Sequence, residues 1–144
     1  MAKRVVVTGM GVISPIGNDV PTFWNNLVNG VCGIDYIQEF PTENLPVRIA
    51  GKVKDFHPEN YGMDKGFSRK QDLFTQYGVA AAYEAMNQAG LIAEGEGQNI
   101  DPFRLGVYVG SGIGGFEIQY RETAKMIEDP SGQWISPLFI PTMI

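Results

Sequence analysis

A cluster of glycines behind a short apolar segment constrains this chain more than any other feature of its sequence. Residues 105–109 are continuously apolar and lead directly into Gly110-Ser111-Gly112-Ile113-Gly114-Gly115. Glycine adopts positive φ without strain and lets another group approach where a Cβ would collide. We therefore expect a buried strand that ends in a tight turn. The turn, named here the glycine turn (residues 110–115), is the most favourable place for a ligand pocket.

The amino-terminal residues predict a second central strand. Residues 4–8 are dominated by three consecutive valines, and this continuous pattern is typical of a strand with helices over both faces of its sheet. Between residues 31 and 66 several prolines and glycines predict an excursion over the surface. Within it, residues 47–53 alternate apolar and basic side chains like an edge hairpin. The acidic, glycine-rich residues 93–99 predict a solvated loop.

Three amphipathic helices are predicted from apolar side chains at helical spacing. The first begins at residues 18–21, which carry helix-start chemistry, and ends at Gly30. The second presents one apolar face along residues 74–89 and ends at Gly90, and its small residues imply close packing. The third covers residues 116–128. The order β, α, α, β, α predicts a layered α/β fold.

Composition restricts the classes of protein to which the chain can belong. Its 144 residues, 44% hydrophobic and 19% charged, are typical of one globular domain. The net charge is −5 and no cluster of lysine or arginine could neutralise a row of phosphates, so a nucleic acid partner is not expected. The basic start resembles a secretion signal, but residues 8–15 interrupt its apolar part too early, and no later run approaches the ~20 residues of a membrane span. The protein is therefore expected to stay in the cytoplasm. Cys32, the only cysteine, can form no internal disulfide and no metal site of several cysteines, which agrees with a reducing compartment.

One interpretation of the glycine turn is a dinucleotide site. Gly110, Gly112 and Gly115 satisfy the pattern G-x-G-x-x-G between a predicted strand and a predicted helix, which suggests an NAD(P)-binding oxidoreductase domain. That fold also needs an acidic residue at the end of the next strand, about twenty residues further on. Here Glu128 and Asp129 fall at a helix end instead. The dinucleotide site therefore remains an alternative.

The two glycine-containing turns and their surroundings resemble another family more closely. The sequence from Val5 to Asn18, which reads VVVTGMGVISPIGN, resembles the amino-terminal signature of β-ketoacyl-[acyl carrier protein] synthases of the elongating synthase II type. The resemblance continues at residues 23–24, 50–56, 110–115 and 135–141, and so covers essentially the whole chain. Modular polyketide synthases open differently at residues 13–15, which favours the discrete fatty-acid enzyme.

The resemblance implies a thiolase-like fold of two similar halves. In that family a cysteine at a helix amino-terminus accepts an acyl group from acyl carrier protein, and two histidines assist the decarboxylation of malonyl-carrier protein before the carbon–carbon bond forms. Those residues lie beyond the equivalent of Ile144, so residues 1–144 are expected to be an amino-terminal part, truncated before the nucleophile and inactive alone. No cofactor is implied. Cys32 follows a predicted helix end and His57 lies in the irregular segment, so we expect neither to be catalytic.

The resemblance also assigns pocket residues. Ile113 corresponds to the floor of the acyl channel, and Phe139 corresponds to a residue that reaches the neighbouring subunit's channel across a homodimer interface. Gly112 and Gly114 would let the chain bend around the pocket. The alternative is that Ile113 and Phe139 are ordinary core residues. For Phe139 we favour the interface, because residues 134–144 are strongly apolar and exposed runs of this kind mark an interface or a missing partner.

Basic residues before the second predicted helix form a candidate docking patch. Arg69 and Lys70 precede a helix whose expected cap is Ser68 or Asp72, where positive charge opposes the helix dipole. The family uses basic residues at this position to contact the acidic carrier protein, and Lys65 could join them. Ordinary solvated surface charge is the alternative. A third hypothesis for the whole chain is a non-catalytic partner, like the chain-length-controlling subunits that resemble synthases but lack the nucleophile.

Overall fold

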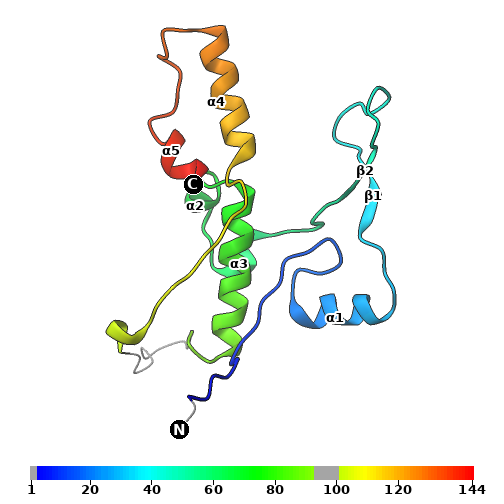
Figure 1. Ribbon diagram of the computed structural model, residues 1–144, viewed down its shortest axis with the longest axis vertical. Coiled ribbons are helices and arrows are strands. Elements are labelled where there is room, and N and C mark those ends of the chain that lie inside the picture. The colour runs from blue at the N-terminus through cyan, green and yellow to red at the C-terminus, as the bar shows by residue number, and fades with distance from the viewer. Residues whose placement is uncertain (1–2, 93–100) are drawn as a thin grey trace. The chain divides into compact units, whose positions relative to one another are not determined.

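The structure is a computed structural model that describes residues 3–92 and 101–144, so the loop predicted at residues 93–99 lies outside the described residues. The described residues divide between two compact units, Met1–His57 with Ala80–Gln98 and Pro58–Val79 with Asn99–Ile144, named here the first and second units. Figure 1 labels the helices and strands in chain order: α1 (Val20–Val28), β1 (Ile34–Tyr36), β2 (Ile49–Gly51), α2 (Lys65–Ser68), α3 (Leu73–Gln88), α4 (Phe116–Glu128) and α5 (Phe139–Met143). Two 3-10 turns, η1 (Pro58–Tyr61) and η2 (Pro102–Arg104), complete the described elements.

Helix α1 forms where its capping residues predict it. The side chain of Asp19 accepts a hydrogen bond from the Thr22 backbone N–H at 2.7 Å, which satisfies one of the free donors of the first turn. Pro21 lies in that turn, where its missing N–H costs nothing. Gly30 follows the helix with φ of 68°, the left-handed conformation that ends many helices. The predicted first helix is therefore confirmed.

The two longer helices are present, but the buried side chains of α3, Gln76 and Ala80, lie off its predicted apolar face, of which Gly78, Ala82 and Met86 are exposed. Helix α4 has the predicted bounds, and α3 begins one residue before the predicted apolar face and ends two residues before Gly90, whose φ is 70°. Within α3, Ala80 is fully buried, and burial raises the pKa of the Tyr77 hydroxyl above its ordinary value. These helices could be predicted from the sequence because caps, helix breakers and helical spacing act within a few residues.

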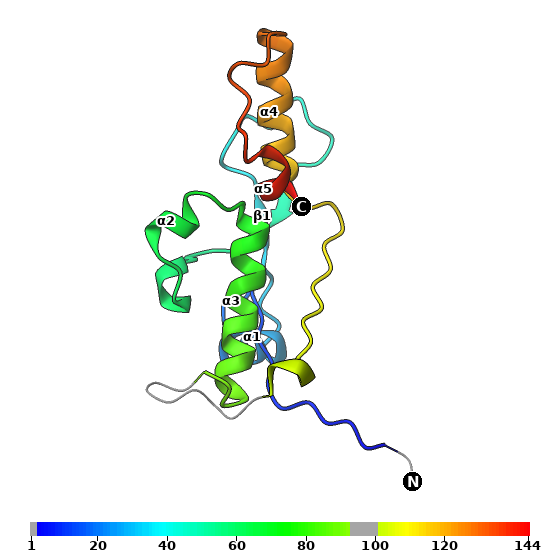
Figure 2. The same ribbon diagram turned by 90° about the vertical axis from the view of Figure 1, so that its left-hand side faces the viewer.

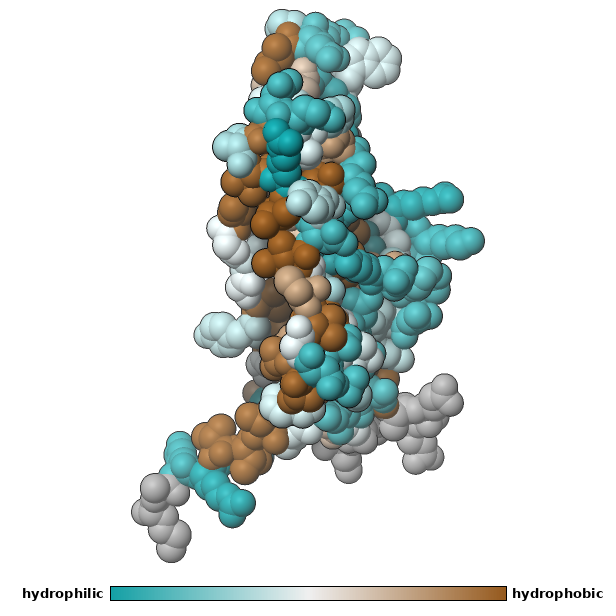
Figure 3. All heavy atoms as spheres, turned by 90° about the vertical axis from the view of Figure 1, so that its right-hand side faces the viewer, coloured by the Kyte–Doolittle hydropathy of each residue, from teal (hydrophilic) through white to brown (hydrophobic). Residues whose placement is uncertain are grey.

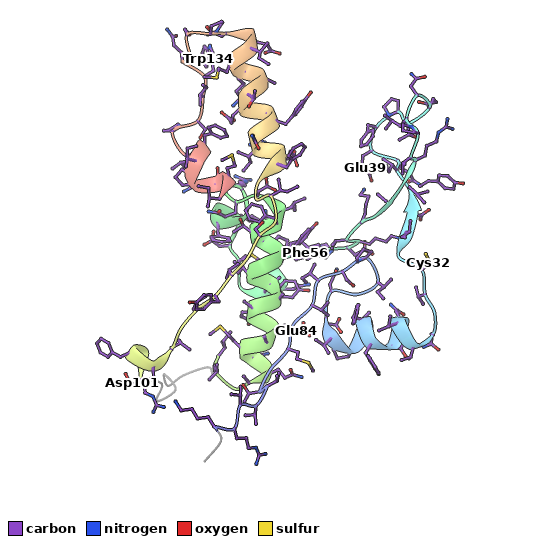
Figure 4. All side chains as sticks on the ribbon, in the orientation of Figure 1. Cys32, Glu39, Phe56, Glu84, Asp101 and Trp134 are labelled. Carbon is purple, nitrogen blue, oxygen red and sulfur yellow. The ribbon has the colours of Figure 1, made fainter. Side chains whose placement is uncertain are left out.

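In the first unit the amino-terminal segment packs closely on α3. A Cβ at Gly9 would overlap the carbonyl oxygen of Ala85, and one at Gly11 would overlap that of Ala81, so only glycine allows this approach. Glu84 of α3, labelled in Figure 4, accepts hydrogen bonds from two backbone N–H groups of the same segment, Val12 at 2.9 Å and Val20 at 2.7 Å. The close packing predicted from the small residues of α3 is thus confirmed, and its partner is the glycine-containing amino-terminal segment.

The predicted edge hairpin is confirmed for β2, and its partner strand is β1, which the sequence did not reveal. Strands β1 and β2 are antiparallel, with Ile34 opposite Gly51 and Tyr36 opposite Ile49. Glu39 and Lys52 form an exposed ion pair beside the hairpin. Three residues in a turn-rich stretch are too few for a recognisable strand pattern, which is why β1 was not predicted.

Both predicted central strands are wrong. Residues 4–8 and 105–109 belong to no strand, and their side chains are largely exposed: Val5 is 91% exposed and Val107 80%. Figure 3 shows hydrophobic side chains, in brown, gathered on the exposed face that it draws. The physical reason is that a strand is stable only when its N–H and C=O groups pair with a neighbouring strand. Neither segment has such a neighbour among the described residues, although both have the composition of a buried strand.

The second unit contains α4 and α5, which lie side by side in both ribbon views (Figures 1 and 2). Among the described residues of both units, the buried apolar side chains are Met63, Ala80 and Ile118, and the buried polar side chains are Gln76 and Glu122. Polar groups therefore take an unusual share of the interior. No helix in the described part of the chain is long and apolar enough to cross a bilayer.

Candidate functional site

The glycine turn docks on the carboxyl end of α5. Gly115, the residue before α4, donates its backbone N–H to the Met143 carbonyl oxygen at 2.7 Å. Gly114 has φ of 77°, and a Cβ there would overlap the same oxygen. The Gly114 N–H is in turn bound by the Ser111 hydroxyl at 3.0 Å. Gly114 is thus required twice, for its backbone conformation and for the close approach of α5.

The other predicted pocket residues are placed differently. Ile113 points largely into solvent, with 75% of its surface exposed, and a Cβ at Gly112 would meet no atom within 4 Å. Phe139 begins α5 and is half-buried. The structure therefore brings the glycine turn and α5, the two segments expected to carry pocket residues, into direct contact. The two glycines differ in role: the contact requires glycine at position 114 but not at position 112.

A buried carboxylate fixes the segment that leads into α5. Glu122 of α4 has a side chain only 3% exposed, and it accepts hydrogen bonds from the Lys125 ammonium at 2.7 Å and from the Ser136 backbone N–H at 2.8 Å. These two bonds hold the pKa of Glu122 below its ordinary value, the Lys125 bond most strongly. The Ser136 carbonyl then accepts the Phe139 N–H at 2.9 Å. Glu122 thereby anchors the turn from which Phe139 projects, a role that the sequence did not reveal.

The predicted docking residues lie on α2 and the turn after it. Lys65 is the first residue of α2, Arg69 is its carboxyl-terminal cap, and Lys70 follows. We name these three the basic turn. All three side chains are exposed, and none makes an ion pair or side-chain hydrogen bond within residues 3–92 and 101–144. A cationic group without a counter-ion is free to bind an anionic partner.

The predicted cap of this region needs correction. Ser68 ends α2 and caps nothing; its hydroxyl donates to the Asp64 carbonyl oxygen at 3.0 Å, and Asp64 is the cap of α2. Asp72 precedes α3, but its Oδ2 atom is buried and accepts no hydrogen bond from the described residues. Arg69 therefore lies at the carboxyl end of one helix as well as before the next. A positive charge is favourable at the first of these places and unfavourable at the second.

Gln76 holds the basic turn in shape. Its side chain is 6% exposed, and its amide nitrogen donates to the carbonyl oxygens of Ser68 at 2.9 Å and Gln71 at 3.0 Å. These acceptors bracket Arg69 and Lys70 on either side. Gln76 could not be predicted from the sequence, because helical spacing places it off the predicted apolar face of α3. A polar residue there is ordinarily read as solvated.

A cleft of about 450 Å³ opens beside the basic turn in the second unit. Its lining includes residues 69–73 and, from α4, Glu117, Ile118, Arg121 and Glu122. Ser136, Leu138 and Thr142 close one side. The cleft is rich in charge, with Arg69, Lys70 and Arg121 among its cations and Asp72, Glu117 and Glu122 among its anions. A cavity of this size admits a few side chains of a partner molecule.

Cys32 and His57 lie outside this arrangement. Cys32 is an exposed free cysteine between α1 and β1, as Figure 4 shows, so it has no helix amino-terminus to activate it. His57 is exposed and belongs to the first unit. In the described part of the chain, no group of three or more histidine, cysteine, aspartate or glutamate residues could hold a metal ion.

Comparison with known proteins decides the family. The family model described as the amino-terminal domain of β-ketoacyl synthase matches residues 2–144. The chain belongs to the β-ketoacyl synthase family. Among curated relatives, the 3-oxoacyl-[acyl-carrier-protein] synthase 2 of Staphylococcus aureus (strain COL) is 46% identical over 143 residues, and that of Vibrio cholerae serotype O1 is 44% identical over 142 residues. Each alignment covers 99% of this chain and 33% of the relative, so the chain spans about a third of their length.

Solved ketosynthase structures resemble the chain closely enough to show its fold. The ishigamide ketosynthase/chain length factor matches 96% of the chain and 33% of its own, with a TM-score of 0.72 and 27% identity. A ketosynthase bound to a hexaketide, in complex with its type II polyketide synthase acyl-carrier protein, matches 99% and 36%, with a TM-score of 0.69 and 29% identity. The chain is a part of the thiolase-like fold that these enzymes share. The comparisons favour the ketosynthase interpretation of the glycine turn over the dinucleotide one.

Proposed function

We propose that this β-ketoacyl synthase chain is the amino-terminal part of a 3-oxoacyl-[acyl-carrier-protein] synthase that elongates fatty acyl chains. The observation that carries the proposal is 46% identity, over 143 residues, to a protein of that name. In the reaction the acyl carbonyl carbon forms a bond to C2 of a malonyl group on carrier protein. The malonyl carboxylate leaves as CO₂, and the acyl group leaves its thiol, so the product is a 3-oxoacyl thioester of the carrier protein. No cofactor takes part in this scheme.

The acyl pocket is the first contribution of this chain to the proposed enzyme. Ile113 forms the pocket floor, Gly112 and Gly114 let the chain turn around it, and Phe139 reaches the channel of the second subunit of a homodimer. The contact between the glycine turn and α5 supports this assignment, because it couples the two segments that carry the pocket residues. The exposure of Ile113 supports it as well, since the side chain is available to line a cavity.

Carrier-protein docking is the second contribution. The basic turn presents three cations without counter-ions in the described structure, and Gln76 holds two of them in a fixed backbone turn. An acidic carrier protein would supply the missing negative charge. One of the similar solved structures is a ketosynthase in complex with an acyl-carrier protein, which is the kind of partner proposed here.

The catalytic residues belong to the rest of the enzyme. The chain spans about a third of its curated relatives, and Cys32 has no helix amino-terminus to activate it. We assign the nucleophilic cysteine and both histidines to the remaining two thirds, which would also supply strand neighbours for residues 4–8 and 105–109. The complete enzyme is expected to work in the cytoplasm.

Reconstituted condensation tests the proposal. The full-length protein, with an acyl-carrier protein and malonyl-carrier protein, should release CO₂ and form the 3-oxoacyl product, both detectable by mass spectrometry and CO₂ capture. The 144-residue chain alone should form no product, and its Cys32 should stay unacylated. A full-length protein that binds both substrates without condensing them, or acylation of Cys32 in the isolated chain, would contradict the proposal.

A second candidate is a chain-length-controlling partner without a nucleophile. It is favoured by the similarity to a solved ketosynthase/chain length factor. That candidate predicts that the full-length protein is inactive by itself and raises the activity of a second synthase-like chain when the two are mixed. The same condensation assay, run with and without such a chain, separates the two candidates.

A further inference from the structure

Three cations from two separate elements face the cleft of the second unit. Arg69 and Lys70 belong to the basic turn, whereas Arg121 belongs to α4. They are far apart in the sequence, so no local pattern could have grouped them. The fold alone places Arg121 beside two residues that the proposed function uses for docking.

Arg121 has binding capacity that the described structure leaves unused. Its side chain is 57% exposed, and its single ion pair in the described structure is a long one, 3.7 Å from Nε to Oε1 of Glu122. The carboxylate of Glu122 is already bound by Lys125 and by the backbone N–H of Ser136 at much shorter distances. A guanidinium group carries five N–H donors, so most of those of Arg121 are available to another partner.

The charges that remain in the cleft indicate the chemistry of its partner. Lys125 neutralises Glu122, which leaves the three cations against the carboxylates of Asp72 and Glu117. The three cations outnumber these two carboxylates, so the cleft favours a partner that brings a carboxylate.

We infer that Arg121 extends the basic turn into one docking surface and that the cleft receives an acidic side chain of the carrier protein. The inference rests on the proposed function, because it takes the carrier protein as the partner. It adds a contact from α4 that no sequence pattern indicates. The acidic side chain would lie between Arg121 and Lys70.

Charge reversal in the full-length enzyme tests the inference. We would compare Arg121→Glu and Lys70→Glu with Arg104→Glu, a matched control that makes the same change of charge at η2, away from the cleft. The KM for malonyl-carrier protein should rise about three- to tenfold in the first two variants and stay unchanged in the control. In the first two variants this KM should also depend less on salt concentration than in the wild type. The KM for malonyl-pantetheine, which lacks the carrier protein, should not change in any variant.

The outcomes separate the inference from the proposed function. If Lys70→Glu raises the KM for the carrier substrate and Arg121→Glu behaves like the control, docking stands and the role of Arg121 is refuted. If both behave like the control, carrier docking at this face is refuted as well. If Arg121→Glu raises the KM for both substrates alike, its effect lies in folding, and the milder Arg121→Gln variant must then raise only the carrier KM for the inference to stand. Inorganic phosphate that competes as well as carrier protein would refute the choice of partner.

Discussion

Replacing Gly114 with alanine should open the contact between the glycine turn and α5. A non-glycine residue at the positive φ of this position costs about 1–2 kcal/mol. The new Cβ would also overlap the Met143 carbonyl oxygen, and overpacking of this kind costs about 1–3 kcal/mol. A shift of α5 relieves only the overlap, so the substitution favours the open contact by about 1–3 kcal/mol, while the backbone strain remains in both states.

Hydrogen exchange at the Gly115 amide measures this opening directly. That N–H is bound to the Met143 oxygen at 2.7 Å, so its protection reports whether the contact is closed. A change of about 2 kcal/mol lowers the protection factor about thirtyfold, and a larger change abolishes it.

Gly112→Ala provides the matched control in the same turn. Its added Cβ meets no atom within 4 Å, so protection at Gly115 should be unchanged. The reasoning would be refuted if Gly114→Ala left the Gly115 amide protected, or if the two alanine variants lost protection equally. Either result would mean that the approach of α5 does not depend on the missing side chain of Gly114.

Three further substitutions test individual contacts through the free energy of unfolding of the chain in urea. Glu84→Gln leaves a single amide oxygen for two backbone donors and should lower the free energy of unfolding by about 1–3 kcal/mol. An unchanged free energy of unfolding would show that these bonds do not hold the amino-terminal segment. Gly11→Ala should cost about 1–3 kcal/mol because its Cβ overlaps Ala81, while Gly78→Ala, with open space around it, should be neutral or stabilising. The pKa of Glu122 is lowered in the folded chain, so its charge stabilises the fold above the ordinary carboxyl range, and this stability is lost as the pH falls through the folded pKa. The wild type should therefore lose more stability than Glu122→Gln between about pH 6 and about pH 2. Parallel curves of unfolding free energy against pH for the two proteins would contradict the lowered pKa of Glu122.

The helices could be predicted from the sequence because their signals are local. Asp19 and Pro21 fix the start of α1, and Gly30 and Gly90 end α1 and α3 in the left-handed conformation. Each of these residues acts on backbone groups within one turn of itself. No knowledge of the distant chain is needed to place such an element.

The predicted strands failed because a sheet depends on residues far away in the chain. Residues 4–8 and 105–109 have the composition of buried strands, yet neither finds a hydrogen-bonding neighbour among the described residues. The pattern reports what a segment prefers when a sheet is present. It contains no information on whether the neighbouring strands are available.

The candidate site divides in the same way. Arg69 and Lys70 could be proposed from their position in the chain, and the glycine turn from its composition. Gln76 and Glu122 could not, because a buried polar side chain is recognisable only when its partners are known. Arg121 belongs to the second group, since only the fold places it on the same cleft as the basic turn.

Acyl chain-length selectivity tests most directly whether this chain lines the pocket of a condensing enzyme. In the full-length protein, Ile113→Phe should lower kcat/KM for long acyl substrates by about tenfold or more and leave short ones unchanged, because a larger side chain shortens the pocket from its floor. Ile127→Phe is the matched control, since Ile127 is 76% exposed and Ile113 75%. The expected result is a shift to shorter acyl chains in Ile113→Phe alone. An unchanged chain-length profile, or the same change in both variants, would contradict it.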